Sequence, residues 1–153
     1  MTQYIYIASP MSLPQGSFGE NPISPEKPNV FKTELDFVHL SFETNYDSEI
    51  KKRFSYSPHF TYKHQVAGYA NQIPFPNTIS GSSEEEKCLR ILYNYLEGAI
   101  EKSSIVEYFT SLNGDEDLAL SNKRSVNWED IKDPYDLVIE DRELLEITLW
   151  KCS

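Results

Sequence analysis

The chain has 153 residues, of which 39% are hydrophobic and 13% are aromatic. These values are typical of a single folded domain with an apolar core, expected here to span residues 1–153. The formal net charge is −10, and no basic stripe is present to neutralise phosphates. We therefore expect no direct binding to nucleic acid. No stretch approaches the roughly 20 apolar residues that cross a membrane, so we expect no membrane association.

The negative charge is concentrated in the second half of the chain. Residues 1–80 carry six basic and seven acidic side chains, whereas residues 81–153 carry eight basic and seventeen acidic ones. Such an imbalance is common among acidic proteins that bind nothing basic. It is also typical of a surface that attracts a basic partner and raises the rate of encounter.

The two cysteines, Cys88 and Cys152, do not form a disulfide framework. We expect both to be reduced thiols, with Cys88 in the apolar core. The N-terminus also has neither the basic region nor the long apolar core of a signal peptide. Together these features predict a cytoplasmic protein.

The first half of the chain is expected to be rich in β-structure. Residues 4–7 are apolar on both faces, which predicts an inner strand. Residues 9–29 contain five prolines and two glycines, which predict an irregular loop pinned by Leu13 and Phe18. The stretches 30–46 and 54–69 alternate in polarity, and we expect them to pair with each other.

Residues 83–102 carry the longest helical pattern in the chain. Ser83 is the expected N-cap, and Glu86 three residues later completes a possible capping box. Leu89, Leu92 and Leu96 belong to an apolar stripe that covers more than half of the helix circumference, so the helix is expected to be buried on several sides.

The remaining residues predict a short second helix and two closing strands. Residues 105–112 have an apolar side, and Gly114 is placed to end a helix there. Residues 127–131 resemble a helical turn, and residues 137–149 alternate in two short runs. The predicted fold class is α+β: a mainly antiparallel sheet with one long helix, about 83–102, and a short second helix packed on it.

The sequence contains no recognisable catalytic motif. No Gly-x-Ser-x-Gly elbow is present, and His59 and His64 would face opposite sides of a strand, so they cannot share a metal ion. We expect no catalytic residues, no metal and no cofactor, and therefore no enzymatic activity. Two other interpretations stay open: a small enzyme or ligand-binding domain with a pocket near the 9–29 loop, and a structural adaptor subunit.

Two regions of the sequence resemble a known class of proteins. The chain begins with YIYIASPM at residues 4–11 and LPQGSFG at residues 13–19, and it closes with PYDL at residues 134–137 and DRELLEI at residues 141–147. In these segments it resembles the small bacterial immunity proteins of contact-dependent growth inhibition and related polymorphic toxin systems. The resemblance implies an antitoxin, acting as a monomer, that binds the C-terminal domain of one cognate toxin, frequently a nuclease, and blocks its active site or its access to substrate.

The charge of the chain agrees with this class of partner. A nuclease is usually basic because it must hold phosphates, and an inhibitor gains from an acidic surface that resembles the substrate. The predicted partner-binding residues are Glu97, Glu101, Asp115, Glu116, Asp117, Glu129, Asp130 and Asp133.

Overall fold

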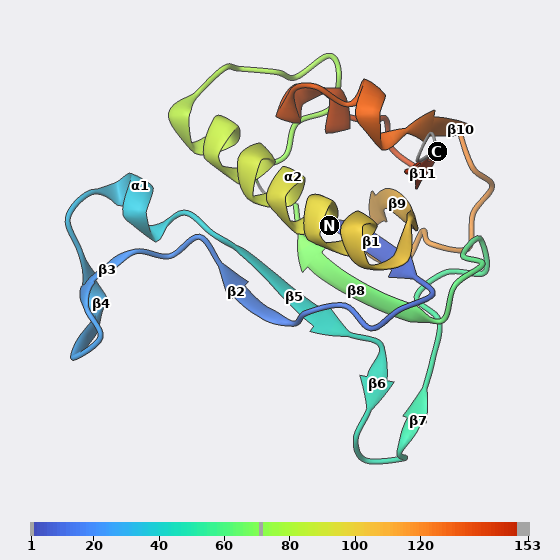
Figure 1. Cartoon of the computed structure of the whole chain (residues 1–153), viewed down its shortest axis with the longest axis horizontal. Helices are drawn as coiled ribbons and strands as arrows, with labels where there is room; N and C mark the ends of the chain where they lie inside the picture. Colours follow the sequence, from blue (N-terminus) through green and yellow to red (C-terminus); the bar gives the residue numbers. More distant parts are fainter. Residues whose placement is uncertain (1, 71, 150–153) are drawn as a thin grey trace.

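The computed structural model describes residues 2–70 and 72–149 and shows one long helix lying against a seven-stranded sheet (Figure 1). The helix is α2 (Ser83–Ser103). The sheet strands are β1 (Gln3–Ser9), β2 (Gly16–Phe18), β5 (Leu40–Thr44), β8 (His64–Tyr69), β9 (Ile105–Leu112), β10 (Asn122–Asn127) and β11 (Glu143–Thr148). Their order is β10-β11-β9-β1-β8-β5-β2, and every neighbouring pair is antiparallel except β10 and β11. The predicted α+β class, with a mainly antiparallel sheet and one long helix, is confirmed.

The other elements are short. Two hairpins extend away from α2 in Figure 1: β3 (Pro22–Ser24) with β4 (Lys27–Phe31), and β6 (Tyr46–Asp47) with β7 (Lys52–Arg53). The remaining elements are single helical turns: α1 (Glu34–Phe37), η1 (Trp128–Asp130) and η2 (Pro134–Leu137).

The N-terminal half largely follows the sequence pattern. β1 is an inner strand between β8 and β9, as predicted. β5 and β8 pair, with Thr44 opposite Val66, so the predicted pairing of the 30–46 and 54–69 stretches is confirmed for their strand portions. Leu13 is buried and Phe18 packs against the core, which confirms that both pin this segment. The prediction that residues 9–29 are irregular was partly wrong, because they contain β2, β3 and the start of β4.

The prediction of a short second helix at residues 105–112 was wrong, because these residues form strand β9. The apolar positions Ile105, Tyr108, Phe109 and Leu112 have helical spacing, but almost every residue between them is also buried. β9 lies between β11 and β1, and both of its faces are covered, since Val106 and Tyr108 belong to one core and Phe109 to the other. A short run that is apolar on both faces has no periodicity that separates a buried strand from a buried helix.

The predicted pair of closing strands was also partly wrong. β11 is present, but Leu137 belongs to the helical turn η2. The neighbour of β11 on its outer side is β10, which runs parallel to it from Asn122–Glu143 to Asn127–Thr148. β10 is an edge strand with mostly exposed, polar side chains, so its sequence does not have the hydrophobic signal by which strands are recognised.

The start of α2 is one residue earlier than predicted. Ser82 is the N-cap, and its hydroxyl oxygen accepts a hydrogen bond from the Glu85 amide at 3.2 Å. The C-cap of the helix is Ser104, which has a left-handed backbone (φ 66°) and donates its amide hydrogen to the Ile100 carbonyl. Among the described residues, no helix has both the length and the apolar character that crossing a membrane requires.

The sheet separates two cores. The larger core lies under α2 and contains Ile5, Ile7 and Tyr108 from the sheet with Leu92 and Leu96 from the helix. It also includes Cys88, whose burial confirms the prediction for this thiol and raises its pKa to about 11; Cys152 lies outside the described residues. The smaller core lies on the opposite, helix-free face, and its buried members are Tyr6, Ala67, Phe109 and Leu144.

Candidate functional site

Four of the eight predicted partner-binding residues belong to α2 and to the helical turn η1. The helix and η1 are joined where Tyr93, one turn before Glu97, packs on Trp128 with ring centroids 4.9 Å apart. Glu97 lies one turn after Tyr93 in α2, and Glu129 and Asp130 follow Trp128 in η1, so this ring contact links the two elements that carry these carboxylates. This group is called here the helix-side acidic surface, and it consists of Glu97, Glu101, Glu129 and Asp130.

The acidic loop 115–117 lies on the other face of the sheet. The Glu116 carboxylate accepts hydrogen bonds from the Tyr6 hydroxyl at 2.7 Å and from the Gly114 amide, and Tyr6 belongs to the core on the helix-free face. Burial by itself would raise the pKa of Glu116, but these hydrogen bonds outweigh it and the pKa is lowered. The structure therefore does not bring the predicted residues together on a single surface.

Asp133, the eighth predicted residue, has a structural role. It is the N-cap of η2, where its carboxylate accepts a hydrogen bond from the Tyr135 amide at 2.8 Å. Asp136 completes a capping box with it. Asp133 thus holds the turn that connects η1 to the rest of the C-terminal segment.

The predicted carboxylates are otherwise left without partners in the described part of the chain. None of the eight forms an ion pair there, since the four ion pairs present involve Glu20, Glu86, Asp141 and Glu143. Apart from Glu116 and Asp133, their side chains also accept no hydrogen bond from these residues. Their negative charge is therefore balanced only by solvent and ions.

Within residues 2–70 and 72–149, the three histidines belong to no cluster that could hold a metal ion. His39 lies 3.4 Å from a Glu20 carboxylate oxygen. The His59 ring contacts the Leu118 carbonyl at 2.7 Å, and His64 begins β8. Burial lowers the pKa of His64, and nearby basic side chains lower it further. These contacts position loops rather than a nucleophile.

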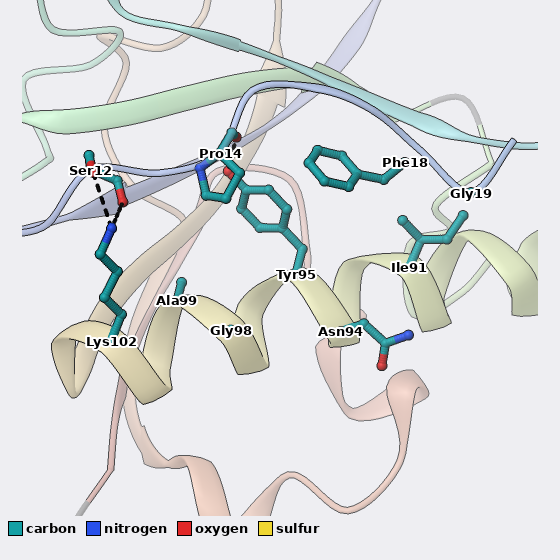
Figure 2. A pocket seen from close by; sticks show the side chains of 10 residues that line it. All are labelled: Ser12, Pro14, Phe18, Gly19, Ile91, Asn94, Tyr95, Gly98, Ala99 and Lys102. Atoms are coloured by element: carbon teal, nitrogen blue, oxygen red, sulfur yellow. Dashed lines mark hydrogen bonds between the residues drawn. The ribbon is translucent and has the colours of Figure 1, made fainter.

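A pocket of about 460 Å³ lies between α2 and the predicted 9–29 loop (Figure 2). Figure 2 shows the Phe18 and Tyr95 rings near one another between the loop and the helix, and their centroids are 5.4 Å apart with an edge-to-face arrangement. The Tyr95 hydroxyl donates a hydrogen bond to the Pro14 carbonyl and ties the loop to the helix. This pocket is called here the loop-side pocket.

The polar groups of the loop-side pocket are few. Lys102 lies at one end, where its ammonium donates to the hydroxyl and the carbonyl oxygen of Ser12 at 3.2 and 3.4 Å. Asn94 supplies an amide. Gly98 and Ala99 also line the pocket, and their small size leaves room between the helix and the loop. No histidine or carboxylate lines it. The arrangement can bind an apolar group, and its polar groups include the Lys102 ammonium, the Asn94 amide and the Tyr95 hydroxyl.

The sequence interpretation missed a group of tyrosines on the helix-free face. Tyr4, Tyr6, Tyr56 and Tyr69 line a hollow there together with Glu43 and Glu116. The alternation of Tyr4 and Tyr6 in a predicted strand was a signal that both point to one face. Their neighbours on that face depend on the strand register, which the sequence does not contain.

Comparison of the chain with known protein families, with curated proteins and with solved structures finds no match.

Proposed function

We propose that this protein is an immunity-type inhibitor that acts in the cytoplasm and binds one basic toxin domain, such as a nuclease, through acidic surface residues. The observation that supports the proposal best is the set of carboxylates without partners. Glu97 and Glu101 belong to α2, Glu129 and Asp130 belong to η1, and none of the four makes an ion pair within the described chain.

The physical argument is one of charge and rigidity. Unpaired carboxylates on a folded surface attract a basic partner, raise the association rate and select the orientation of docking. The helix-side acidic surface is carried by a 21-residue helix whose inner side is fully packed. A rigid surface of this kind loses little conformational entropy when it binds.

The first experiment is co-expression with the reading frame encoded immediately upstream, with a tag on that neighbour only. The proposal predicts that the two proteins co-purify and that the chain protects cells from the neighbour's toxicity. If the neighbour is toxic and the chain neither binds it nor protects the cells, the proposal is wrong.

Charge reversal then tests the surface itself. The variant Glu97→Lys/Glu101→Lys is expected to weaken the complex by about tenfold or more at moderate salt, because it places like charges opposite the partner. The control Glu26→Lys/Glu49→Lys makes the same change in net charge on exposed residues of the two hairpins. Equal losses in both variants would show that only the total charge matters and would contradict a role for the helix-side acidic surface.

A second candidate function is the binding of a small apolar ligand in the loop-side pocket, which is favoured by its volume and by Phe18, Ile91 and Tyr95 in its lining. Lys102 suits an anionic group on such a ligand. A medium-chain carboxylate such as octanoate should then raise the melting temperature of the protein. Gly98→Leu should abolish this rise. Gly98 lines the pocket and a Cβ there meets nothing within 4 Å, so the leucine side chain would occupy the space of the ligand. An unchanged melting temperature in the wild type would exclude this class of ligand.

A further inference from the structure

The helix-free face of the sheet carries a hollow of about 240 Å³ that is both aromatic and acidic. We refer to it as the tyrosine hollow. None of the residues that line it is basic. The six side chains that determine its chemistry are Tyr4, Tyr6, Tyr56, Tyr69, Glu43 and Glu116.

The strand register explains why these side chains meet. Tyr4 of β1 is paired with Tyr69 of β8, and Tyr6 is paired with Ala67. Ala67 is paired in turn with Glu43 of β5. Because alternate residues of a strand point to the same face, these side chains form two adjacent rows across three strands. Ala67 is the small member of its row and leaves the space between Tyr6 and Glu43 open.

The tyrosine rings form a continuous wall. The centroid of Tyr4 lies 4.9 Å from that of Tyr69 and 6.1 Å from that of Tyr6, and Tyr6 lies 5.4 Å from Tyr56. The Tyr56 hydroxyl donates hydrogen bonds to two carbonyl oxygens of β5 at 3.0 and 3.1 Å. The wall is thus held in place before any ligand binds.

The electrostatic potential of the hollow is negative. The Glu43 carboxylate is exposed and forms neither an ion pair nor a hydrogen bond with the described residues. An interaction with the Tyr69 hydroxyl raises the pKa of Tyr4, and so do burial and the charges of Glu43 and Glu116. Burial, with the charge of Glu43, raises the pKa of Tyr56 to about 12. The raised pKa values of Tyr4 and Tyr56 favour their neutral forms, and the hydrogen bonds that lower the pKa of Glu116 favour its ionised form.

We propose that the tyrosine hollow binds the guanidinium group of an arginine side chain presented by a partner protein. The planar guanidinium stacks on aromatic rings and donates hydrogen bonds in a fork that matches carboxylates. Tyr69 is 56% exposed, so its ring is accessible, and Glu43 has free acceptor oxygens beside it. A lysine ammonium is more strongly hydrated and fits such a site less well. The inference rests on the proposed function in one respect: the arginine is taken to belong to the basic partner.

The protein itself uses the same contact elsewhere. In the β6–β7 hairpin, the guanidinium carbon of Arg53 lies 5.8 Å from the centroid of the Tyr46 ring. Among the residues that the structure describes, no second ring flanks Tyr46, whereas the tyrosine hollow offers several rings and two carboxylates. The hollow is therefore a stronger version of an interaction that this chain already forms.

The test is a titration of the full chain with N-acetylarginine amide, followed by the backbone amide NMR signals of β5 and β8. Saturable shifts are expected for Glu43 and for Ala67–Tyr69. N-acetylcitrulline amide has the same shape without the charge and should bind at least about tenfold more weakly. N-acetyllysine amide with a free side-chain ammonium should bind with intermediate affinity. Equal binding of the arginine and citrulline compounds would overturn the proposal.

Two variants locate the site. Tyr69→Ala removes the accessible ring and Glu43→Gln removes one charge, and each should weaken arginine binding by about fivefold or more. The control Glu49→Gln removes a charge from the exposed β6–β7 turn and should leave the affinity unchanged. Shifts that persist unaltered in both site variants would place the arginine elsewhere and refute the assignment.

The titration does not require a toxin, so its result is separate from that of the proposed function. If the cognate toxin binds but tolerates Tyr69→Ala and Glu43→Gln, the hollow does not receive a side chain of that partner and the inference fails. If no toxin binds, the proposed function fails, and the titration still decides whether the hollow recognises arginine.

Discussion

At the scale of single residues, Glu107 is a buried carboxylate that is only half satisfied. It is fully buried on β9, where one oxygen accepts hydrogen bonds from the amides of Thr61 and Tyr62 at 2.8 and 3.2 Å. The other oxygen is buried and has no hydrogen-bond partner among the described residues. Glu146 lies directly across the strand pair. Burial raises the pKa of Glu107, the two amides oppose this effect, and the charge of Glu146 adds to it.

Glu107→Gln is expected to stabilise the protein in a pH-dependent way. The pKa of Glu107 is raised above its ordinary value of 4.5, so between the two values the folded state binds more protons than the unfolded state. The contribution of this group to the free energy of unfolding therefore falls as pH rises through that window. The glutamine cannot ionise, and its gain over the wild type should grow with pH to about 1 kcal/mol or more.

Urea denaturation at a series of pH values from 4 to 8 measures this difference. Glu101→Gln, at an exposed position of α2, is the control and should follow the wild type closely. A gain for Glu107→Gln that does not change with pH would contradict the assignment of a raised pKa.

Gly19 shows a second constraint at the residue scale. Its φ is +106°, and a Cβ atom there would lie 2.3 Å from Ile91 Cδ1 and 3.2 Å from the Val38 carbonyl oxygen. Gly16 has a similar φ of +114°, but a Cβ there would meet nothing within 4 Å. Gly19 is thus required both by the backbone and by the close approach of the loop to α2.

Alanine at these two positions should separate the effects. Gly16→Ala is expected to lower the free energy of unfolding by about 1–2 kcal/mol through backbone strain alone. Gly19→Ala should cost about 1–3 kcal/mol more, because the methyl group also overpacks the contact with Ile91. Equal losses in chemical denaturation would show that the loop moves away from the helix without cost. A Gly19→Ala/Ile91→Ala double variant should recover part of the loss.

At the scale of elements, the N-cap of α2 is Ser82 and not the expected Ser83. Ser82, Ser83 and the three glutamates after them all suit a helix N-terminus. The loop decides between the two serines, because the Glu85 carboxylate accepts hydrogen bonds from the amides of Ser80 and Gly81 at 2.9 and 2.7 Å. It also accepts a bond from the Tyr135 hydroxyl of η2. Burial would raise the pKa of Glu85, but these bonds outweigh it and lower the pKa.

The corrected cap makes a direct prediction. Ser82→Ala should lower the free energy of unfolding by about 1 kcal/mol, the usual cost of losing an N-cap side chain. Ser83→Ala should change it by no more than a few tenths of a kcal/mol, since alanine is a good residue inside a helix. Thermal or urea unfolding of both variants provides the comparison. A larger loss for Ser83→Ala than for Ser82→Ala would restore the original assignment.

The central strands show where the pattern of a single element is insufficient. Residues 83–102 were recognised as helical because their apolar residues form a stripe with a polar arc opposite. Residues 105–112 have no such arc, and only their position between β1 and β11 makes them a strand. β10 is the converse case, because its partner β11 supplies the hydrogen bonds and its own side chains contribute little burial.

At the scale of the whole molecule, the uncompensated negative charge should affect stability. The net charge is −10, and the described residues contain few ion pairs. Repulsion among these charges opposes the compact state, and added salt screens it. The free energy of unfolding at pH 7 should therefore rise between 10 and 200 mM NaCl.

Urea denaturation at the two salt concentrations measures the effect. In Glu97→Lys/Glu101→Lys each substitution adds two charge units, so the net charge changes from −10 to −6. The salt effect should be smaller in this variant. A salt effect that is absent from the wild type, or unchanged in the variant, would show that the carboxylates are too far apart to repel one another appreciably.

The candidate surfaces were predictable only in part. The excess of acidic residues after residue 80 is evident from the sequence. Their division between two faces is not evident. It depends on the loop 115–117, which is held to the helix-free face by the Tyr6 hydroxyl and by a hydrogen bond of 2.7 Å from the Ser57 hydroxyl to the Glu116 carbonyl. Both donors are distant in sequence from the residue they hold.

The sequence by itself determined the fold class, the long helix and the acidic character of this protein, because propensity, apolar periodicity and charge are properties of neighbouring residues. Only the tertiary structure decided that residues 105–112 form a central strand and that Tyr4 and Tyr6 meet Tyr69 and Glu43 in one hollow. These outcomes depend on strand order and register. Both are set by contacts between residues far apart in the chain, where local pattern carries no information.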